Sequence, residues 1–89
     1  MKILVTGCAG MIGSYLTSHL LNLFPKEEGN EIIGIDNLSR GKLLNLKEAC
    51  GKKFEDLFFL DESLSAFDYS WANYFKKLDI VIHLADIVA

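Results

Sequence analysis

Three glycines spaced three residues apart constrain this chain more than any other feature. Gly7, Gly10 and Gly13 form a GxxGxxG pattern that begins just after a short apolar run at residues 3–5. A continuous apolar run of this kind is typical of a strand that is buried on both faces, as in a parallel sheet. The glycines therefore mark the passage from a buried strand into the element that follows it.

The residues after this passage have the spacing of a helix. Apolar residues recur at helical intervals over residues 11–24, and Pro25 ends the run. The apolar face consists of Ile12, Tyr15, Leu16, Leu20, Leu23 and Phe24, and the opposite polar face of Ser14, Thr17, Ser18 and Asn22. An amphipathic helix packs its apolar face on the core, so we expect the first set to be buried.

The rest of the chain continues this alternation of strand and helix. The expected strands are residues 3–5, 32–35, 57–60 and 78–85, and the expected helices are residues 11–24, 42–50 and 68–77. Such alternation implies right-handed crossovers and a parallel sheet with helices on both faces. We predict an α/β fold: a partial doubly wound Rossmann fold of four parallel strands in the order 3-2-1-4. Because 89 residues are about 0.6 of an average domain, we expect residues 1–89 to form one half-domain that ends after the fourth strand.

The glycine pattern predicts a binding site for a phosphate group. A phosphate can rest on the positive end of a helix only where the backbone comes close, and side chains would block that approach. Gly7 would supply the tight turn, Gly10 the close passage, and Gly13 the close packing of the helix on the strand. A glycine-rich turn without a ligand has the same pattern, so the glycines alone leave both interpretations open.

An acidic residue at the end of the second strand favours a dinucleotide. Asp36 lies 23 residues after Gly13, close to the ~20 expected for an acid that binds ribose hydroxyls. A carboxylate there accepts hydrogen bonds from the ribose and repels a 2′-phosphate, which favours NAD over NADP. Arg40 would instead accommodate a 2′-phosphate, and an Asp at a strand end is often only the cap of a turn. The placement of the acid favours NAD.

Three segments together resemble a known family. They are the glycine pattern, Asp36-Asn37-Leu38-Ser39-Arg40-Gly41 after the second strand, and Asp79-Ile80-Val81-Ile82-His83-Leu84-Ala85. In combination they are similar to the extended short-chain dehydrogenase/reductases, in particular the NAD-dependent epimerase/dehydratases that act on nucleotide sugars. The resemblance covers this whole chain but only the N-terminal third of such an enzyme. It implies NAD as the cofactor, with a nucleotide sugar bound only when the rest of the enzyme is present.

The resemblance also assigns contacts with the cofactor. It places Gly7, Gly10, Met11 and Ile12 in the pyrophosphate loop, Asp36 and Asn37 at the adenosine ribose with Ser39 and Arg40 beside them, Asp61 and the adjacent Glu62 at the adenine, and Leu84 and Ala85 along the cofactor. Two positions depart from the family pattern: Leu60 stands where glycine is common, and Asp86 where a second small residue is usual.

The family's catalytic pair is missing from the chain. That pair is a Tyr and a Lys four residues apart, in which the ammonium lowers the pKa of the phenol. The tyrosines Tyr15, Tyr69 and Tyr74 are followed at that spacing by His19, Asn73 and Leu78. We therefore expect no catalytic residue in this chain and no activity from it alone.

Composition excludes several other functions. Nine Lys and Arg against 12 Asp and Glu give a net charge of −3, which lacks the basic surface that nucleic acid requires. No apolar run approaches the ~20 residues of a membrane span, and no signal peptide is present, so we expect a cytoplasmic protein without membrane contact. Cys8, Cys50, His19 and His83 lack metal-ligand spacing, so no metal site is expected. Cys8 would lie near a helix N-terminus, where a thiolate is stabilised, although such a position more often only accommodates a small side chain than has a redox role.

A non-enzymatic alternative also fits the sequence. The chain would then be a small Rossmann module that binds a nucleotide, or binds a partner chain through its unfinished sheet. In this arrangement the far edge of the fourth strand is unpaired and apolar, which favours homo-oligomers. In a further alternative, the chain is a piece of a longer polypeptide that supplies the catalytic Tyr and Lys.

Overall fold

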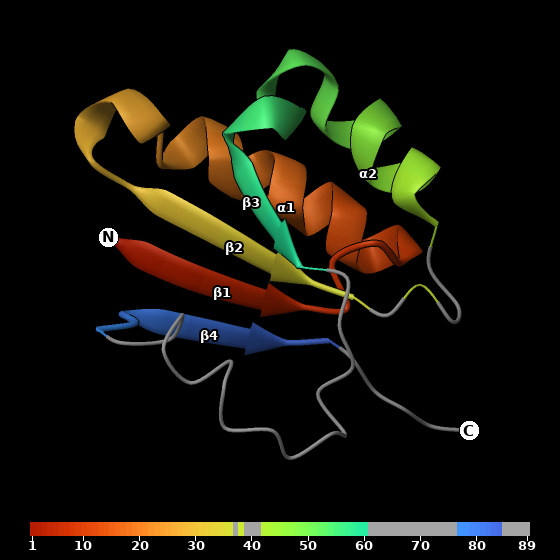
Figure 1. Ribbon diagram of the computed structural model, residues 1–89, viewed down its shortest axis with the longest axis horizontal. Helices are drawn as coiled ribbons and strands as arrows, with labels where there is room; N and C mark the ends of the chain where they lie inside the picture. Colours follow the sequence, from red (N-terminus) through yellow and green to blue (C-terminus); the bar gives the residue numbers. More distant parts are fainter. Residues whose placement is uncertain (37, 39–41, 61–76, 85–89) are drawn as a thin grey trace.

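Four parallel strands form the sheet of the computed structural model, which describes residues 1–36, 38, 42–60 and 77–84. The strands are β1 (Lys2–Thr6), β2 (Glu31–Ile35), β3 (Leu57–Leu60) and β4 (Ile80–His83). They lie side by side in the order β3-β2-β1-β4, and their arrows point the same way in Figure 1. The predicted α/β fold and strand order are therefore confirmed, although the fourth strand is shorter than expected.

In the described part of the chain, two helices cover one face of this sheet, so the expected cover of the second face stays a prediction (Figure 1). The helices are α1 (Met11–Leu23) and α2 (Leu43–Cys50), and two short 3-10 helices are η1 (Lys26–Glu28) and η2 (Gly51–Asp56). The expected helices at residues 11–24 and 42–50 are confirmed, whereas the one expected at residues 68–77 lies outside the described residues except for Lys77. Within the described part of the chain, no helix is both long and apolar enough to cross a bilayer.

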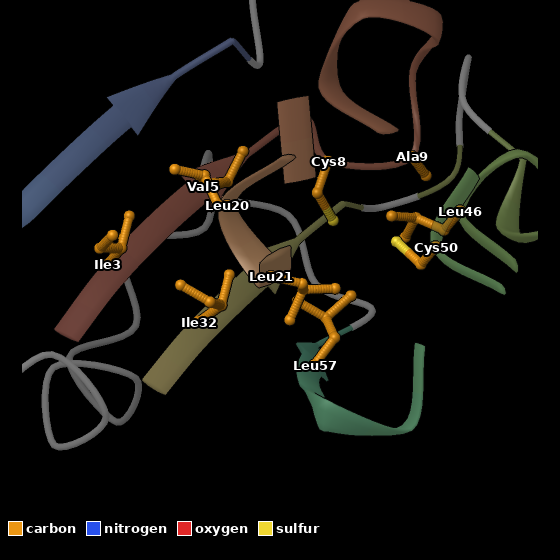
Figure 2. Packing of buried hydrophobic residues seen from close by; sticks show 10 residues of the cluster. All are labelled: Ile3, Val5, Cys8, Ala9, Leu20, Leu21, Ile32, Leu46, Cys50 and Leu57. Carbon is orange, nitrogen blue, oxygen red and sulfur yellow. The ribbon is translucent and has the colours of Figure 1, made fainter. Parts of the chain in front are cut away.

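The core lies between the sheet and the two helices. Its buried residues are Ile3, Val5, Cys8, Ala9, Leu20, Leu21, Ile32, Leu46, Cys50 and Leu57 (Figure 2). A smaller cluster of Leu4, Ile33 and Ile35 lies on the other face of the sheet. Since successive side chains of a strand point to opposite faces, both central strands must be apolar at nearly every position. This explains why β1 and β2 have continuous apolar runs rather than alternating ones.

The buried face of α1 differs from the expected one. The three expected core residues found at the surface are Ile12, Tyr15 and Leu23, which are 74%, 67% and 67% exposed. The expected polar face is instead partly buried, since Ser14 and Thr17 are inaccessible to solvent. Small side chains at these positions let α1 approach the sheet closely, and the Thr17 hydroxyl donates to the carbonyl oxygen of Gly13 at 2.7 Å. Because that hydroxyl is hydrogen-bonded, its burial costs little.

Candidate functional site

The segment Gly7–Gly10, here called the glycine loop, lies at the carboxyl ends of the strands. Gly7 has a φ of +73°, a left-handed conformation that glycine adopts without steric cost. Its N–H donates to the carbonyl oxygen of Ile35 at 2.8 Å, and the N–H of Gly10 donates to the carbonyl oxygen of Gly7 at 3.3 Å. The chain thus turns sharply at the end of β1, beside the end of β2, and enters α1.

Gly13 and Gly10 are glycines for different reasons. A Cβ atom on Gly13 would lie 2.0 Å from the carbonyl oxygen of Gly7, so the backbone of the glycine loop excludes any side chain there. A Cβ atom on Gly10 would lie 3.5 Å from the same oxygen, which is an ordinary contact. The backbone of the glycine loop therefore requires glycine at position 13, whereas the described residues leave space for a side chain at position 10.

The N-terminus of α1 is open for an anion. Gly10 is the N-cap residue and has no side chain to cap the helix, and the first turn contains no acidic residue. The first intrahelical bond at this end runs from the N–H of Ser14 to the carbonyl oxygen of Gly10 at 2.8 Å. The N–H groups of Met11, Ile12 and Gly13 precede it and have no intrahelical acceptor. Such N–H groups, together with the positive end of the helix dipole, form a site that suits a phosphate.

Asp36 holds the glycine loop from the side of β2. Its Oδ2 atom accepts a hydrogen bond from the N–H of Ala9 at 2.9 Å, and its Oδ1 atom accepts one from the N–H of Leu38 at 2.7 Å. Asp36 is 9% exposed as a residue; its bond to Ala9 is buried, and its bond to Leu38 is partly buried. Each carboxylate oxygen has two acceptor positions, which leaves capacity for a further donor such as a ribose hydroxyl.

Residues at the start of α2 also form hydrogen bonds with the glycine loop. The carbonyl oxygen of Ala9 accepts hydrogen bonds from the N–H of Lys42 at 3.1 Å and from the Asn45 side-chain amide at 3.2 Å. The backbone of Ala9 is therefore held at both its N–H and its C=O. Asn45 was not among the residues expected from the sequence, because it lies in a helix and belongs to no recognised motif.

The end of β4 lies beside the end of β1. Leu84 follows β4, and its N–H donates to the carbonyl oxygen of Thr6 at 3.0 Å and to the Thr6 Oγ1 atom at 3.1 Å. The same Oγ1 atom lies 2.7 Å from the Nδ1 atom of His83. Leu84, one of the predicted cofactor contacts, is thus placed next to the start of the glycine loop. Sequence reasoning missed Thr6, whose only signal was its position directly before Gly7.

The structure brings together only part of the predicted site. Gly7, Gly10, Met11, Ile12, Gly13, Asp36 and Leu84 lie at the carboxyl edge of the sheet. The predicted contacts Asn37, Ser39, Arg40, Asp61, Glu62 and Ala85 lie outside the described residues.

Cys8 does not have the environment of a reactive thiol. Its side chain is fully buried in the core between the sheet and the helices. Burial, with a smaller effect of the neighbouring Asp36 carboxylate, raises the pKa of the Cys8 thiol from 9.0 to about 12. The expectation that the helix N-terminus stabilises a thiolate here is therefore wrong, because desolvation dominates. Among the residues that the structure describes, no group of three His, Cys, Asp or Glu side chains can hold a metal ion.

Comparison with known proteins identifies similar chains. A family model described as the NAD dependent epimerase/dehydratase family matches residues 3–89. The UDP-glucose 4-epimerase of Bacillus subtilis is 40% identical over 95 residues, which span 100% of this chain and 25% of that protein. The UDP-glucose 4-epimerase structure from Thermotoga maritima, with UDP-glucose, has a TM-score of 0.73 and 32% identity over 100% of this chain and 25% of its own.

A dehydratase has a similar structure as well. The dTDP-glucose 4,6-dehydratase from Streptomyces venezuelae, solved with NAD bound, has a TM-score of 0.75 and 28% identity over 100% of this chain and 27% of its own. The similarity thus extends to proteins named for two different reactions. In each case this chain spans about a quarter of the length of the protein it matches.

Proposed function

This chain belongs to the NAD-dependent epimerase/dehydratase family, and from that membership we propose that it binds NAD as the cofactor-binding N-terminal part of a nucleotide-sugar epimerase or dehydratase. The observation that carries the proposal is the N-terminus of α1 at Gly10, where the first backbone N–H groups have no intrahelical acceptor. There the N-cap residue has no side chain to cap the helix, the first turn has no acidic residue, and the described neighbours give no steric reason for a glycine. A phosphate approaching the backbone supplies that reason.

The residues present fit the dinucleotide in two places. The N–H groups at the start of α1 would hold the pyrophosphate, and the side chains of Met11 and Ile12 in this first turn are exposed at 86% and 74%. Asp36 would accept hydrogen bonds from the adenosine ribose through the acceptor positions that Ala9 and Leu38 leave open. These two places lie at the same edge of the sheet, since Asp36 bonds directly to the glycine loop.

The residue types indicate which functions this chain would have and which would belong to the rest of the protein. NAD, when bound, supplies a reversible hydride acceptor for a sugar carbon. The residues of this chain bind and orient the dinucleotide, and the described part has no Tyr–Lys pair at the spacing of four residues that the resemblance calls for. The acid–base residues and the sugar-binding surface would then belong to the larger part of the protein, as in the relatives that are about four times as long.

We further propose that the chain prefers NAD to NADP. Asp36 carries a negative charge where a 2′-phosphate would lie, and its two backbone hydrogen bonds fix that charge in place. Moving a 2′-phosphate next to a held carboxylate brings two like charges together, which weakens binding.

Titration calorimetry with purified chain tests the proposal. We expect saturable one-to-one binding of NAD and much weaker binding of NADP. Gly10→Ser is the matched variant, because a serine at an N-cap position satisfies the helix end while its side chain occupies the approach of the pyrophosphate. It should keep or slightly raise the free energy of unfolding and lose NAD affinity. Absence of saturable binding by the wild-type chain up to millimolar NAD would overturn the proposal.

One observation favours a second candidate function, the binding of a partner chain at the sheet edge. Among the described strands, β4 pairs only with β1, and Ile80, Val81 and Leu84 are exposed on or just after it. An apolar strand edge of this kind favours pairing with another strand, including that of a second copy. Light scattering at several protein concentrations tests pairing with a second copy: we expect a reversible dimer, and a monomer throughout would exclude that pairing.

A further inference from the structure

Leu38 has an unusual backbone conformation for its residue type. Its φ is +61°, in the left-handed region that residues other than Gly, Asn and Asp rarely adopt. The described part of the chain contains one other such non-glycine residue, the exposed Lys77. Leu38 lies two residues after Asp36, so the strained backbone adjoins the carboxylate that is proposed to bind the adenosine ribose.

Two contacts hold Leu38 in this conformation. Its N–H donates a hydrogen bond to the Oδ1 atom of Asp36 at 2.7 Å, and its half-buried side chain packs against the core cluster between the sheet and the helices. A strained backbone conformation persists only where the surrounding structure enforces it. An asparagine or glycine would adopt the left-handed region at less cost, but neither would bring an apolar side chain to the core. The leucine side chain therefore serves as the anchor of this residue.

The hydrogen bond from Leu38 limits how the carboxylate of Asp36 can turn. The N–H of Ala9 holds the Oδ2 atom at 2.9 Å, and the N–H of Leu38 holds the Oδ1 atom. The last torsion of an aspartate side chain has a broad energy profile, so a single hydrogen bond leaves the carboxylate free to swing. One hydrogen bond on each oxygen fixes the plane of the carboxylate, and with it the directions of the acceptor positions that stay open.

We propose that Leu38 is a positioning residue that aims the Asp36 carboxylate at the adenosine ribose, an inference that rests on the proposed function. The packed side chain of Leu38 holds the left-handed backbone, and this backbone directs the N–H at the Oδ1 atom. Leu38 acts through Asp36 and needs no contact with the ribose. Because hydrogen bonds weaken steeply when they are misaligned, a carboxylate that swings loses its ribose hydroxyl, while the N–H groups at the start of α1 keep the pyrophosphate.

Two ligands separate positioning from stability in titration calorimetry with the purified chain. They are NAD and the NAD analogue that lacks the 2′-hydroxyl of the adenosine ribose. The wild-type chain should bind NAD about tenfold more tightly than the analogue, as expected for one hydrogen bond to a charged group. Leu38→Ala should weaken NAD binding about tenfold and leave analogue binding nearly unchanged, so the two dissociation constants become nearly equal.

Further variants test the anchor itself. Leu38→Gly removes the backbone strain together with the side chain, and it should lose the preference for NAD as Leu38→Ala does. Leu38→Met keeps the apolar volume and should stay within about twofold of wild type. Leu16→Ala is the matched control, since Leu16 is a partly buried leucine of α1 packed against the same core cluster. It should lower the free energy of unfolding in urea, as Leu38→Ala does, and keep the wild-type ratio of the two affinities.

The outcomes distinguish the positioning role from the proposed function. A wild-type chain that binds neither ligand contradicts the proposed function itself. A wild-type chain that binds both ligands equally well overturns the positioning role and leaves cofactor binding intact. The positioning role is also overturned when either Leu38→Ala or Leu38→Gly keeps the wild-type preference for NAD. Loss of that preference in Leu16→Ala has the same meaning, because the effect then follows general stability.

Discussion

The carboxylate of Asp36 and the backbone N–H of Ala9 are joined by a hydrogen bond of 2.9 Å, which ties the end of β2 to the glycine loop. The residue expected to bind the cofactor ribose therefore also holds the loop expected to bind the pyrophosphate. Ligand contact and loop geometry depend on the same side chain, so a change at Asp36 should affect both.

Asp36→Asn tests this double role. The amide has one acceptor oxygen, so its NH2 group must face the N–H of either Ala9 or Leu38 and leave one of them without a partner. We expect the free energy of unfolding to fall by about 1–3 kcal/mol, the cost of leaving a buried donor unsatisfied. NAD affinity should fall as well. Urea unfolding and calorimetry measure the two quantities, and an Asn variant with wild-type stability would show that the carboxylate does not hold the loop.

Alanine should lower the free energy of unfolding much more at Gly13 than at Gly10, whereas at Gly10 its main effect should be on NAD affinity. At Gly13 the added Cβ atom would lie 2.0 Å from the carbonyl oxygen of Gly7, so α1 must move away from the sheet, and we expect a loss of about 3 kcal/mol or more in stability. At Gly10 the nearest atom is 3.5 Å away, and we expect a loss of about 1 kcal/mol or less with a large loss of NAD affinity. Thermal unfolding of both variants checks the ranking, which equal destabilisation would refute.

Gly34 and Cys8 should show coupled stability effects. A Cβ atom on Gly34, in the middle of β2, would lie 2.7 Å from the Cys8 Sγ atom. Gly34→Ala should therefore destabilise the fold by about 1–3 kcal/mol through overpacking. Cys8→Ala removes the sulfur, so the double variant should be more stable than the sum of the two single effects predicts. Strictly additive effects in urea unfolding would mean that the sulfur is not what excludes a side chain from position 34.

The raised pKa of Cys8 predicts a specific alkaline sensitivity. The thiol pKa is about 12 in the folded protein against an ordinary 9.0, so between these values the unfolded chain loses a proton that the folded chain keeps. Stability from this group is thus complete below pH 9 and falls as the pH rises toward 12, by up to about 1.4 kcal/mol per pH unit. Cys8→Ala should show a shallower fall in urea unfolding over this range. Identical slopes would place the thiol in contact with water.

Sequence reasoning predicted the sheet well because its signals are local. The apolar runs of β1 and β2 identify strands buried on both faces, and the alternation of strands and helices fixes the direction of the crossovers. The buried face of α1 could not be predicted in the same way. Ser14 and Thr17 are buried because Gly13 brings the helix close to the glycine loop, which is a tertiary contact that hydropathy does not encode.

The turn at Gly7 and the close packing at Gly13 agree with the structural roles that the glycine spacing indicated. Cofactor binding by these glycines and by Asp36 stays a prediction. The link between Asp36 and Ala9 was not foreseen, because it depends on how two turns 27 residues apart meet in space. The pairing of Thr6 with His83, 77 residues apart, was missed for the same reason. The sequence places His83 in a segment typical of the family and gives its side chain no role; as a metal ligand it lacks partners among the described residues.

The most direct test of the account is a nitrogen–proton correlation spectrum recorded during titration with NAD. The central claim is that the open N-terminus of α1 binds the pyrophosphate, so the amide signals of Gly10, Met11, Ile12 and Gly13 should shift most, together with those of Ala9 and Leu38 around Asp36. NADP at equal concentration should shift them far less. Saturating shifts confined to other parts of the chain, or no shifts at millimolar NAD, would contradict the claim.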